Sequence, residues 1–416
     1  MKHVIIGNGP AGVVAAETLR KNDPSCTITL IGDEPEPPYS RMALPYLMMG
    51  EIGEPGTYLR KGHGHYAGLA IELVQDRVTS VDSAARTVVC ASGKRLPYDR
   101  LLIATGAHPV KPPIPGLDTP GVHACWTMAD ARSIIARAAP GSRVVQVGAG
   151  FIGCIIMEAL VSRGVELTVV EMGDRMVPRM MTPAAGTMIR TWCERKGVRV
   201  HVNARVAAIA RAAGGDALVA RLDSGDELEA DVLIVAAGVQ PNVAFLQGSA
   251  VACATGILVD ATMQTSVPGV YAAGDVAEAI DFSTGDRSLN AVQPNAVEQA
   301  RVAALNMAGR HVESRGSLAL NVLDTLGLIS SSFGKWWGEP GGGAVELIDE
   351  GAFRYLSLQF SDDVLIGATA IGLTEHVGVL RGLIEGRVKL GPWKDRLLRE
   401  PLLVMDAYLA RAQAAA

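Results

Sequence analysis

The sequence predicts an α/β fold in which one kind of βαβ unit occurs twice. The glycine pattern G-x-G-x-x-G appears at residues 7–12 and again at 148–153. Each copy follows a short apolar strand and leads into a helix, which makes it more informative than a lone match. With 416 residues, 49% of them hydrophobic and 19% charged, the chain is long enough for two or three folded domains.

The first copy begins with the apolar strand 3–6 and continues through a helix over 13–21 to a second strand over 27–31. The loop before the helix contains Gly7, Gly9, Pro10, Ala11 and Gly12. Two acids follow the second strand, Asp33 and Glu34, and Asp33 stands 21 residues beyond Gly12. A ribose-binding carboxylate is expected about 20 residues beyond such glycines.

The second copy repeats this order. The strand 143–147 leads into a glycine loop and a helix that reaches residue 163, and the strand 166–170 ends at the acid Glu171. The loop contains Gly148, Gly150, Phe151, Ile152 and Gly153. Glycines let a backbone approach a pyrophosphate, and the helix N-terminus offers free N–H groups and a positive dipole end. The sequence therefore predicts two Rossmann-like, three-layer dinucleotide-binding domains.

Three further segments have the features of strands. Residues 101–106 and 232–238 are apolar stretches that end in glycine, and we expect the chain to leave one domain at the first and return at the second. The segment 271–275 ends in Asp275, where open α/β sheets place ligands. From about residue 316 the composition changes, which predicts a separate C-terminal α+β domain.

Composition limits the partners and the compartment. A formal net charge of -5 and a pI near 5.9 provide no basic face for nucleic acid. The six cysteines stand apart without a CxxC pattern, which is typical of buried thiols in a reducing compartment. His63 and His65 have no ligand cluster beside them, so we expect exposed loop histidines and no metal. Without a long apolar run or a signal-peptide pattern, we expect a cytoplasmic protein with no membrane contact.

The ordered motifs resemble those of the FAD-dependent pyridine nucleotide-disulfide oxidoreductase superfamily. GxGxxG, ATG, GxGxxG and YAAGD begin here at Gly7, Ala104, Gly148 and Tyr271. The resemblance implies an FAD domain in two parts, an inserted NAD(H) domain and an interface domain, over residues 1–110 and 243–315, 111–242, and 316–416.

The resemblance also implies the cofactor contacts. Those to FAD are Gly7, Gly9, Pro10, Ala11, Gly12, Asp33, Glu34, Arg41, Val78, Ala104, Thr105, Gly106, Gly274, Asp275, Val292 and Ala296. Those to NAD(H) are Gly148, Gly150, Phe151, Ile152, Gly153, Ile155, Glu171 and Gly238. Asp33 or Glu34 would meet the adenosine ribose of FAD. Because the cofactors carry the redox chemistry, no catalytic side chain is implied.

Segments 32–35, 38–41 and 293–296 are similar to the rubredoxin, ferredoxin and nitrite reductase branch, and 390–395 is similar to NADH-acceptor subunits of phenylglyoxylate or related 2-oxoacid dehydrogenases. This resemblance implies electron transfer between NAD(H) and a one-electron iron-sulfur protein or subunit, within an oligomer or a multi-subunit complex. Cysteine chemistry beside the flavin is disfavoured, because residues 40–46 contain no cysteine. Glu171 predicts a preference for NADH over NADPH.

Three positions depart from the family pattern. Pro45 stands where many relatives carry a lysine beside the flavin, and Ile155 stands where they place a glutamate near the nicotinamide. Trp126 stands near the position of an arginine and is assigned no role. Pro45 and Ile155 keep a second hypothesis open, that of a nucleotide-binding assembly subunit whose flavin is structural.

Overall fold

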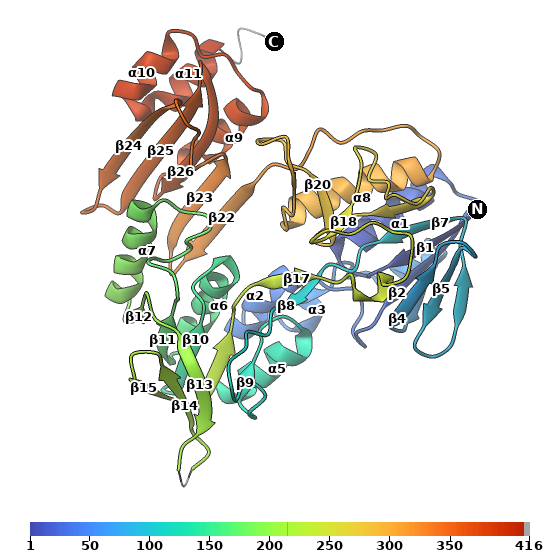
Figure 1. The fold of residues 1–416 in the computed structure, drawn as a ribbon, viewed down its shortest axis with the longest axis horizontal. Coiled ribbons are helices and arrows are strands. Elements are labelled where there is room, and N and C mark those ends of the chain that lie inside the picture. Colours follow the sequence, from blue (N-terminus) through green and yellow to red (C-terminus); the bar gives the residue numbers. More distant parts are fainter. Residues whose placement is uncertain (214, 412–416) are drawn as a thin grey trace. The chain divides into compact units, whose positions relative to one another are not determined.

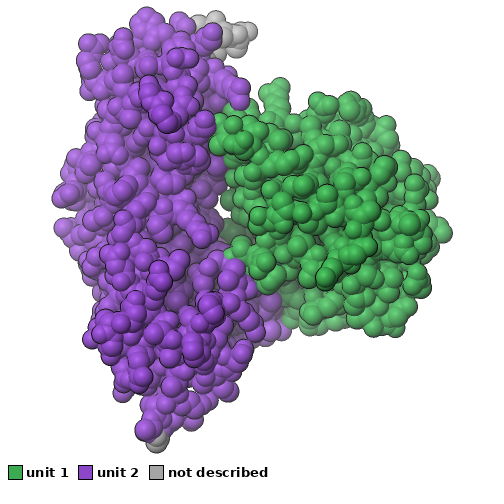
Figure 2. Space-filling model, in the orientation of Figure 1, with its two compact units in different colours: residues 1–44, 52–108, 239–318 green, residues 45–51, 109–238, 319–416 purple. Residues whose placement is uncertain are grey.

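A computed structural model describes residues 1–213 and 215–411 of the chain. It divides into two compact units, coloured separately in Figure 2. The first unit comprises Met1–Leu44, Ile52–His108 and Val239–Leu318, and the second Pro45–Glu51, Pro109–Gly238 and Ala319–Ala416. The last five residues of the predicted C-terminal domain lie outside the described residues.

A five-stranded parallel sheet forms the centre of the first unit (Figure 1). Its strands, in spatial order, are β19 (Val270–Ala272), β7 (Arg100–Ile103), β1 (Lys2–Ile6), β2 (Thr27–Gly32) and β3 (Ile71–Gln75). The register aligns Ile6 with Ile31 and with Ile103, so the carboxyl ends of three strands meet at one edge. The carboxyl-terminal halves of the central strands are apolar because a parallel sheet is buried on both faces.

Two helices pack against each other and against this sheet, α1 (Pro10–Asn22) and α8 (Gln293–Met307). Fully buried alanines on both helices, among them Ala15, Ala16, Ala303 and Ala304, let their backbones come close. Small sheets complete the unit: β4 (Val78–Asp82), β5 (Thr87–Cys90) and β6 (Arg95–Pro97); β18 (Ile257–Leu258), β20 (Ala277–Ile280) and β21 (Arg287–Ser288). Its short helices are η1 (Arg41–Ala43), α3 (Glu54–Thr57), α4 (His65–Gly68) and η2 (Ala244–Leu246).

The second unit contains another five-stranded parallel sheet, with the order β12 (Arg199–His201), β11 (Glu166–Val170), β10 (Arg143–Val147), β16 (Val232–Val235) and β9 (Val122–His123). Four helices belong to this region: α2 (Leu44–Met49), α5 (Met128–Arg137), α6 (Phe151–Ser162) and α7 (Pro183–Arg195). An antiparallel sheet of β13 (Val206–Arg211), β14 (Leu218–Leu222) and β15 (Glu227–Ala230) packs on it. The short strands β8 (Ala107–Pro109) and β17 (Val239–Pro241) pair where the chain passes between the units.

The C-terminal part of the second unit is a five-stranded antiparallel sheet with helices. The sheet order is β22 (Leu320–Thr325), β23 (Leu328–Gly334), β26 (Val364–Ile371), β25 (Arg354–Ser361) and β24 (Gly343–Asp349). The helices are η3 (Thr374–His376), α9 (Val377–Glu385), α10 (Trp393–Arg399), η4 (Pro401–Leu403) and α11 (Val404–Arg411). Its core includes the fully buried rings of Phe333, Tyr355 and Phe360. The predicted α/β class with two Rossmann-like parallel sheets is confirmed. Among the helices of the described part, none has the length and apolar character needed to cross a bilayer.

Candidate functional site: two glycine loops at the edges of parallel sheets

The first glycine loop is held tightly at two of its glycines and open at the third. Gly7 has φ +106°, and a Cβ there would lie 2.1 Å from the carbonyl oxygen of Ala104. A Cβ at Gly12 would lie 1.9 Å from the oxygen of Gly7. A Cβ at Gly9 would meet nothing within 4 Å, and Gly9 precedes α1 without a side-chain cap. The loop therefore leaves open space beside uncapped helix N–H groups, as a pyrophosphate requires.

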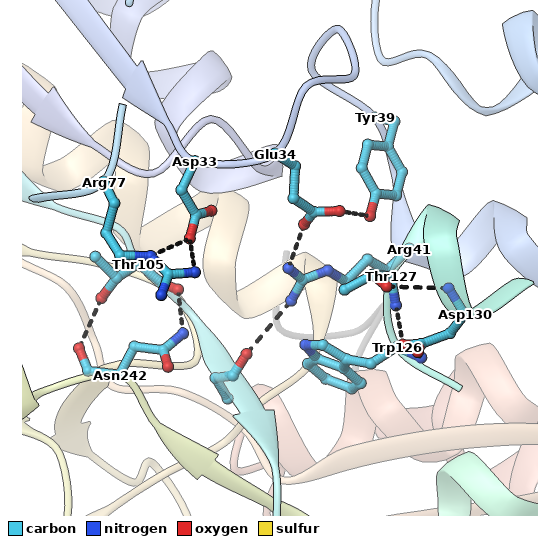
Figure 3. Close-up of polar contacts among 11 residues, drawn as sticks. Asp33, Glu34, Tyr39, Arg41, Arg77, Thr105, Trp126, Thr127, Asp130 and Asn242 are labelled. Carbon is cyan, nitrogen blue, oxygen red and sulfur yellow. Dashed lines mark hydrogen bonds and ion pairs between the residues drawn. The ribbon is translucent and has the colours of Figure 1, made fainter. Parts of the chain in front are cut away.

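The segment Ala104–Gly106 lies next to this loop and is fixed by a residue that the sequence analysis did not select. Asn242 donates from its side-chain nitrogen to the carbonyl oxygen of Thr105 at 2.8 Å (Figure 3). The Thr105 hydroxyl donates to the carbonyl oxygen of Asn242 at 3.0 Å. The Asn242 N–H also donates to the oxygen of Gly106, which has φ +63°. This reciprocal pairing holds the turn after β7 in place.

The two candidate ribose acids differ in their surroundings, as Figure 3 shows. Asp33 is half exposed and forms an ion pair with Arg77 at 3.1 Å. The carboxylate of Glu34 accepts hydrogen bonds from Arg41 at 2.8 Å and from the Tyr39 hydroxyl at 2.6 Å. Arg41 also donates to the carbonyl oxygen of Ala107 at 3.3 Å. Glu34 thus holds Arg41 in a fixed position, and Asp33 is the carboxylate nearer to solvent.

Residues far apart in sequence meet at the turn after β19. A Cβ at Gly274, which has φ +82°, would lie 3.3 Å from the Cβ of Ala11 and 3.5 Å from that of Ala296. The Gly274 N–H donates to Gln299 Oε1 at 2.8 Å, a contact from α8 that the sequence analysis did not identify. Burial raises the pKa of the adjacent Asp275, and the Arg41 guanidinium opposes this rise. The first loop, the YAAGD turn and α8 therefore form one site.

The N-terminus of α8 adds donors to that site. Val292 is the N-cap residue and has extended backbone, and no side chain caps the helix. First-turn N–H groups without a capping side chain are available to an acceptor. Val78, by contrast, begins β4 and is partly buried against the apolar core of the unit. These open donors, with the space at Gly9 and the half-buried Asp275, fit a dinucleotide such as FAD.

The second glycine loop repeats the geometry of the first. A Cβ at Gly148, which has φ +100°, would lie 2.4 Å from the oxygen of Ala236, and one at Gly153 would lie 2.5 Å from the oxygen of Gly148. A Cβ at Gly150 would meet nothing within 4 Å. Gly150 precedes α6 without a side-chain cap. The residues again fit a pyrophosphate.

The side chains of Glu171 and Gln146 support the second glycine loop through hydrogen bonds. The Glu171 carboxylate is buried and accepts from the Ala149 and Gly173 N–H groups, each at 2.7 Å. The Gln146 side chain donates to the carbonyl oxygens of Gly148 at 2.9 Å and Gly153 at 3.0 Å. A glutamine between valines in β10 was the sequence signal for this support. Each carboxylate oxygen of Glu171 keeps a further lone pair for a ribose hydroxyl.

Other selected positions lie around this loop within the second unit. Phe151 and Ile152 stand in the first turn of α6 and Ile155 in the next, all three half-buried. Gly238 has φ +105°, and its carbonyl oxygen accepts from the Val110 N–H at 2.9 Å. The backbone N–H of Trp126 donates to the carboxylate of Asp130, which with Thr127 forms the capping box of α5 (Figure 3).

The described cysteines form no disulfide and are mostly buried. Burial raises the pKa of Cys125 and of Cys193 to about 12 and that of Cys154 still further. These thiols are therefore protonated at neutral pH and unreactive. One histidine prediction was wrong: His65 is a half-buried helix residue that contacts Glu17 at 2.8 Å, whereas His63 is exposed as expected. His65 is held there by the carboxylate that also binds Arg60.

Two parallel sheets, each with a glycine loop of the same geometry, define the class of two-dinucleotide oxidoreductases. The chain belongs to the pyridine nucleotide-disulphide oxidoreductase family, whose model matches residues 1–304. FAD and NAD(H) are the characteristic cofactors of this family. The predicted resemblance is confirmed, and the chain is an NAD(H)-linked flavoprotein oxidoreductase.

Individual relatives agree with this assignment. The chain is 34% identical over 406 residues to the NADH-dependent phenylglyoxylate dehydrogenase subunit epsilon of Aromatoleum evansii. The matched region covers 97% of this chain and 96% of the relative. It is 33% identical to the biphenyl dioxygenase system ferredoxin–NAD(+) reductase component of Paraburkholderia xenovorans, with 93% of each chain covered. The covalent putidaredoxin reductase–putidaredoxin complex has the same fold, with a TM-score of 0.90, 23% identity and 98% of each chain covered.

Proposed function

We propose that this chain transfers electrons between NAD(H) and a one-electron iron-sulfur protein or subunit, with FAD held by the first glycine loop and NAD(H) by the second. The observation that carries the proposal is the shared geometry of the two loops, each with open space over its middle glycine and an uncapped helix behind it. When bound, the flavin supplies the conversion between a two-electron hydride donor and a one-electron acceptor.

The chain's own residues bind and orient the cofactors in this proposal. Gly9 and the N-terminus of α1 receive the FAD pyrophosphate, Asp33 the adenosine ribose, and Asp275 the ribityl or pyrophosphate portion. The N-terminus of α8 at Val292 provides N–H donors for the flavin pyrimidine ring, where a positive dipole end favours the reduced anionic form. The FAD domain then comprises residues 1–110 and 243–315, the NAD(H) domain 111–242 and the interface domain 316–416.

The lack of a cysteine relay beside the flavin indicates which kind of electron acceptor the chain uses. Residues 40–46 contain no cysteine, and the described cysteines are single thiols, four of them buried. A dithiol relay needs two cysteines within disulfide reach, and the described cysteines form no disulfide, so bound FAD would supply electrons to the acceptor without a thiol relay. The likeness to the epsilon subunit supports membership in a 2-oxoacid dehydrogenase complex acting on phenylglyoxylate or a related substrate, and we propose that this complex is cytoplasmic.

Anaerobic titration with NADH tests the proposal directly. We expect one FAD per chain and bleaching of its visible absorbance by about one equivalent of NADH, followed by reoxidation with a one-electron acceptor such as ferricyanide. A flavin that stays oxidised in excess NADH would support the structural-flavin hypothesis instead. Proteins that copurify with the chain would then identify the acceptor or the remaining subunits.

Restoring a carboxylate at position 155 should change the binding of NADH. Ile155 is half-buried on the second turn of α6 and cannot form a hydrogen bond with a carboxamide. In Ile155→Glu we expect NADH to bind about 10- to 150-fold more tightly, the range of one charge-assisted hydrogen bond of about 1.5–3 kcal/mol. Ile155→Leu, which conserves volume, is the matched control. Identical NADH dissociation constants in Ile155→Glu and Ile155→Leu would place residue 155 away from the nicotinamide.

A chain without cysteines should keep its electron transfer. We expect a variant with all six cysteines replaced by serine or alanine to retain NADH-dependent ferricyanide reduction within about twofold, because four of the six are buried and no thiol is needed for the transfer. The measurement is the rate per bound FAD, so partial unfolding does not affect it. Loss of the rate at full FAD occupancy would show that a thiol participates.

A further inference from the structure

A cluster of three potential metal ligands lies at the base of the first βαβ unit. His3 lies on β1, Asp23 is the C-cap residue of α1, and Cys26 directly precedes β2. One ligand atom from each lies within 4.8 Å of the other two. His3 Nε2 is 3.9 Å from Asp23 Oδ2. The sequence shows no such cluster, because the three positions come together only when the βαβ unit folds.

The histidine carries an observation that points to a ligand. The His3 side chain is fully buried, and neither ring nitrogen has a hydrogen-bond partner in the described structure. Buried polar groups are normally satisfied, so an imidazole with two unpartnered nitrogens needs an explanation. Asp23 Oδ1 already accepts from the N–H and the hydroxyl of Ser25, which leaves Oδ2 toward the histidine.

We propose that His3, Asp23 and Cys26 bind a divalent zinc ion, with water as the fourth ligand. Nitrogen, oxygen and sulfur donors together suit Zn²⁺ better than Mg²⁺ or Ca²⁺, which prefer oxygen alone. Ligand atoms of a tetrahedral zinc site lie about 3.3–3.8 Å apart, given bond lengths of about 2.0–2.3 Å. The 3.9 Å separation of Nε2 and Oδ2 therefore needs only a small closure. The Asp23 side chain is 21% exposed, so water can reach the site.

Zinc binding releases one proton and transfers no electrons. The Cys26 thiol now donates to the carbonyl oxygen of Asp23 at 3.0 Å. On binding, its S–H bond breaks, the proton passes to solvent and the sulfur binds zinc as a thiolate. The Arg20 guanidinium, 3.9 Å from Cys26 Sγ, favours the thiolate. Arg20 itself stays bound to the carbonyl oxygens of Pro24, Cys26, Leu69 and Ala70.

The location gives the ion a structural role. Helix α1 begins at the first glycine loop and ends at Asp23, so the cluster lies at the opposite end of the βαβ unit from that loop. Zinc would join β1, α1 and β2 where they are farthest from the loop. We therefore expect it to stabilise the unit without changing FAD content or the rate of NADH oxidation.

Zinc titration of the chelator-treated holoenzyme tests this site. We expect one tightly bound Zn²⁺, a rise in thermal unfolding temperature with added Zn²⁺, and one sulfur ligand by zinc-edge X-ray absorption. Cys26→Ser and His3→Gln should each weaken zinc binding by at least about 10- to 100-fold. Cys90→Ser is the matched control, since Cys90 is another buried thiol of the same unit.

Two results would overturn the proposal: zinc affinity in Cys26→Ser equal to that of the unmodified chain, or zinc binding lost only with the exposed Cys253. If His3→Gln fails to fold, Asp23→Asn removes a partly exposed ligand and takes its place. FAD content measured on the same samples separates this proposal from the proposed function, because loss of zinc should leave FAD bound.

Discussion

Replacing Gly9 by valine is expected to weaken FAD binding by roughly 10- to 100-fold in a chain that still folds. Gly9 has φ -74° and ψ -172°, an extended conformation that any residue adopts. A Cβ there meets no protein atom within 4 Å, so the new side chain can collide only with what binds in that space. Overpacking typically costs about 1–3 kcal/mol, which corresponds to a loss of FAD affinity of this size.

Matched glycine variants make this test specific. Gly150 has the same open environment in the second loop, so Gly150→Val should keep FAD and lose affinity for NADH. Gly62→Val is the control for a glycine with open space outside either loop. FAD dissociation constants of the refolded or FAD-depleted variants and NADH titrations of the holoproteins give the comparison. Equal FAD affinity in Gly9→Val and Gly62→Val would mean that the pyrophosphate does not lie at Gly9.

Removing the carboxylate of Glu171 should lower kcat/KM for NADH by about 100-fold and reduce the preference for NADH over NADPH. In Glu171→Ala the N–H groups of Ala149 and Gly173 lose their acceptor, at about 1–3 kcal/mol for each buried group. The negative charge that would repel a 2′-phosphate is lost as well. Both changes follow from one buried side chain that supports the loop and that we propose as the ribose ligand.

The control for this variant is the exposed acid three residues further on. Asp174→Ala removes the same charge from the same loop but leaves the contacts to Ala149 and Gly173 intact. We expect it to change kcat/KM for NADH by less than about twofold. Steady-state kinetics with NADH and NADPH for both variants are the measurement. An unchanged ratio of the two nucleotides in Glu171→Ala would assign nucleotide selection to another residue.

Local patterns predicted the parts of the site that depend on backbone shape. Gly7, Gly12, Gly148 and Gly153 each touch another backbone segment so closely that only glycine fits, and such a requirement is visible as a short motif. Both βαβ units were predicted for the same reason. The antiparallel strands β4–β6 and β13–β15 were not, because their partially buried, mixed patterns lack a clear period.

Contacts made by side chains across the fold could not be predicted from spacing. Asn242 pairs with Thr105 over 137 residues, and Gln299 reaches Gly274 from α8. The choice between Asp33 and Glu34 also stayed open in the sequence, since both follow β2. The surroundings of the two acids depend on arginines from later segments: Arg41 binds Glu34, and Arg77 binds Asp33.

The burial of the thiols determines which side chains of this enzyme hydrogen peroxide would oxidise first. Hydrogen peroxide forms wherever electrons from a flavin reach oxygen, and it attacks exposed thiolates first. Here Cys125, Cys154 and Cys193 are protonated and shielded, and the pKa of the exposed Cys253 thiol is raised by partial burial, so thiolates are scarce and thioether sulfur is the next target. Met172 is 66% exposed and directly follows Glu171. Oxidative damage should therefore begin as a sulfoxide beside Glu171 and the second glycine loop, and under the proposed function it should impair the use of NADH before the fold is lost.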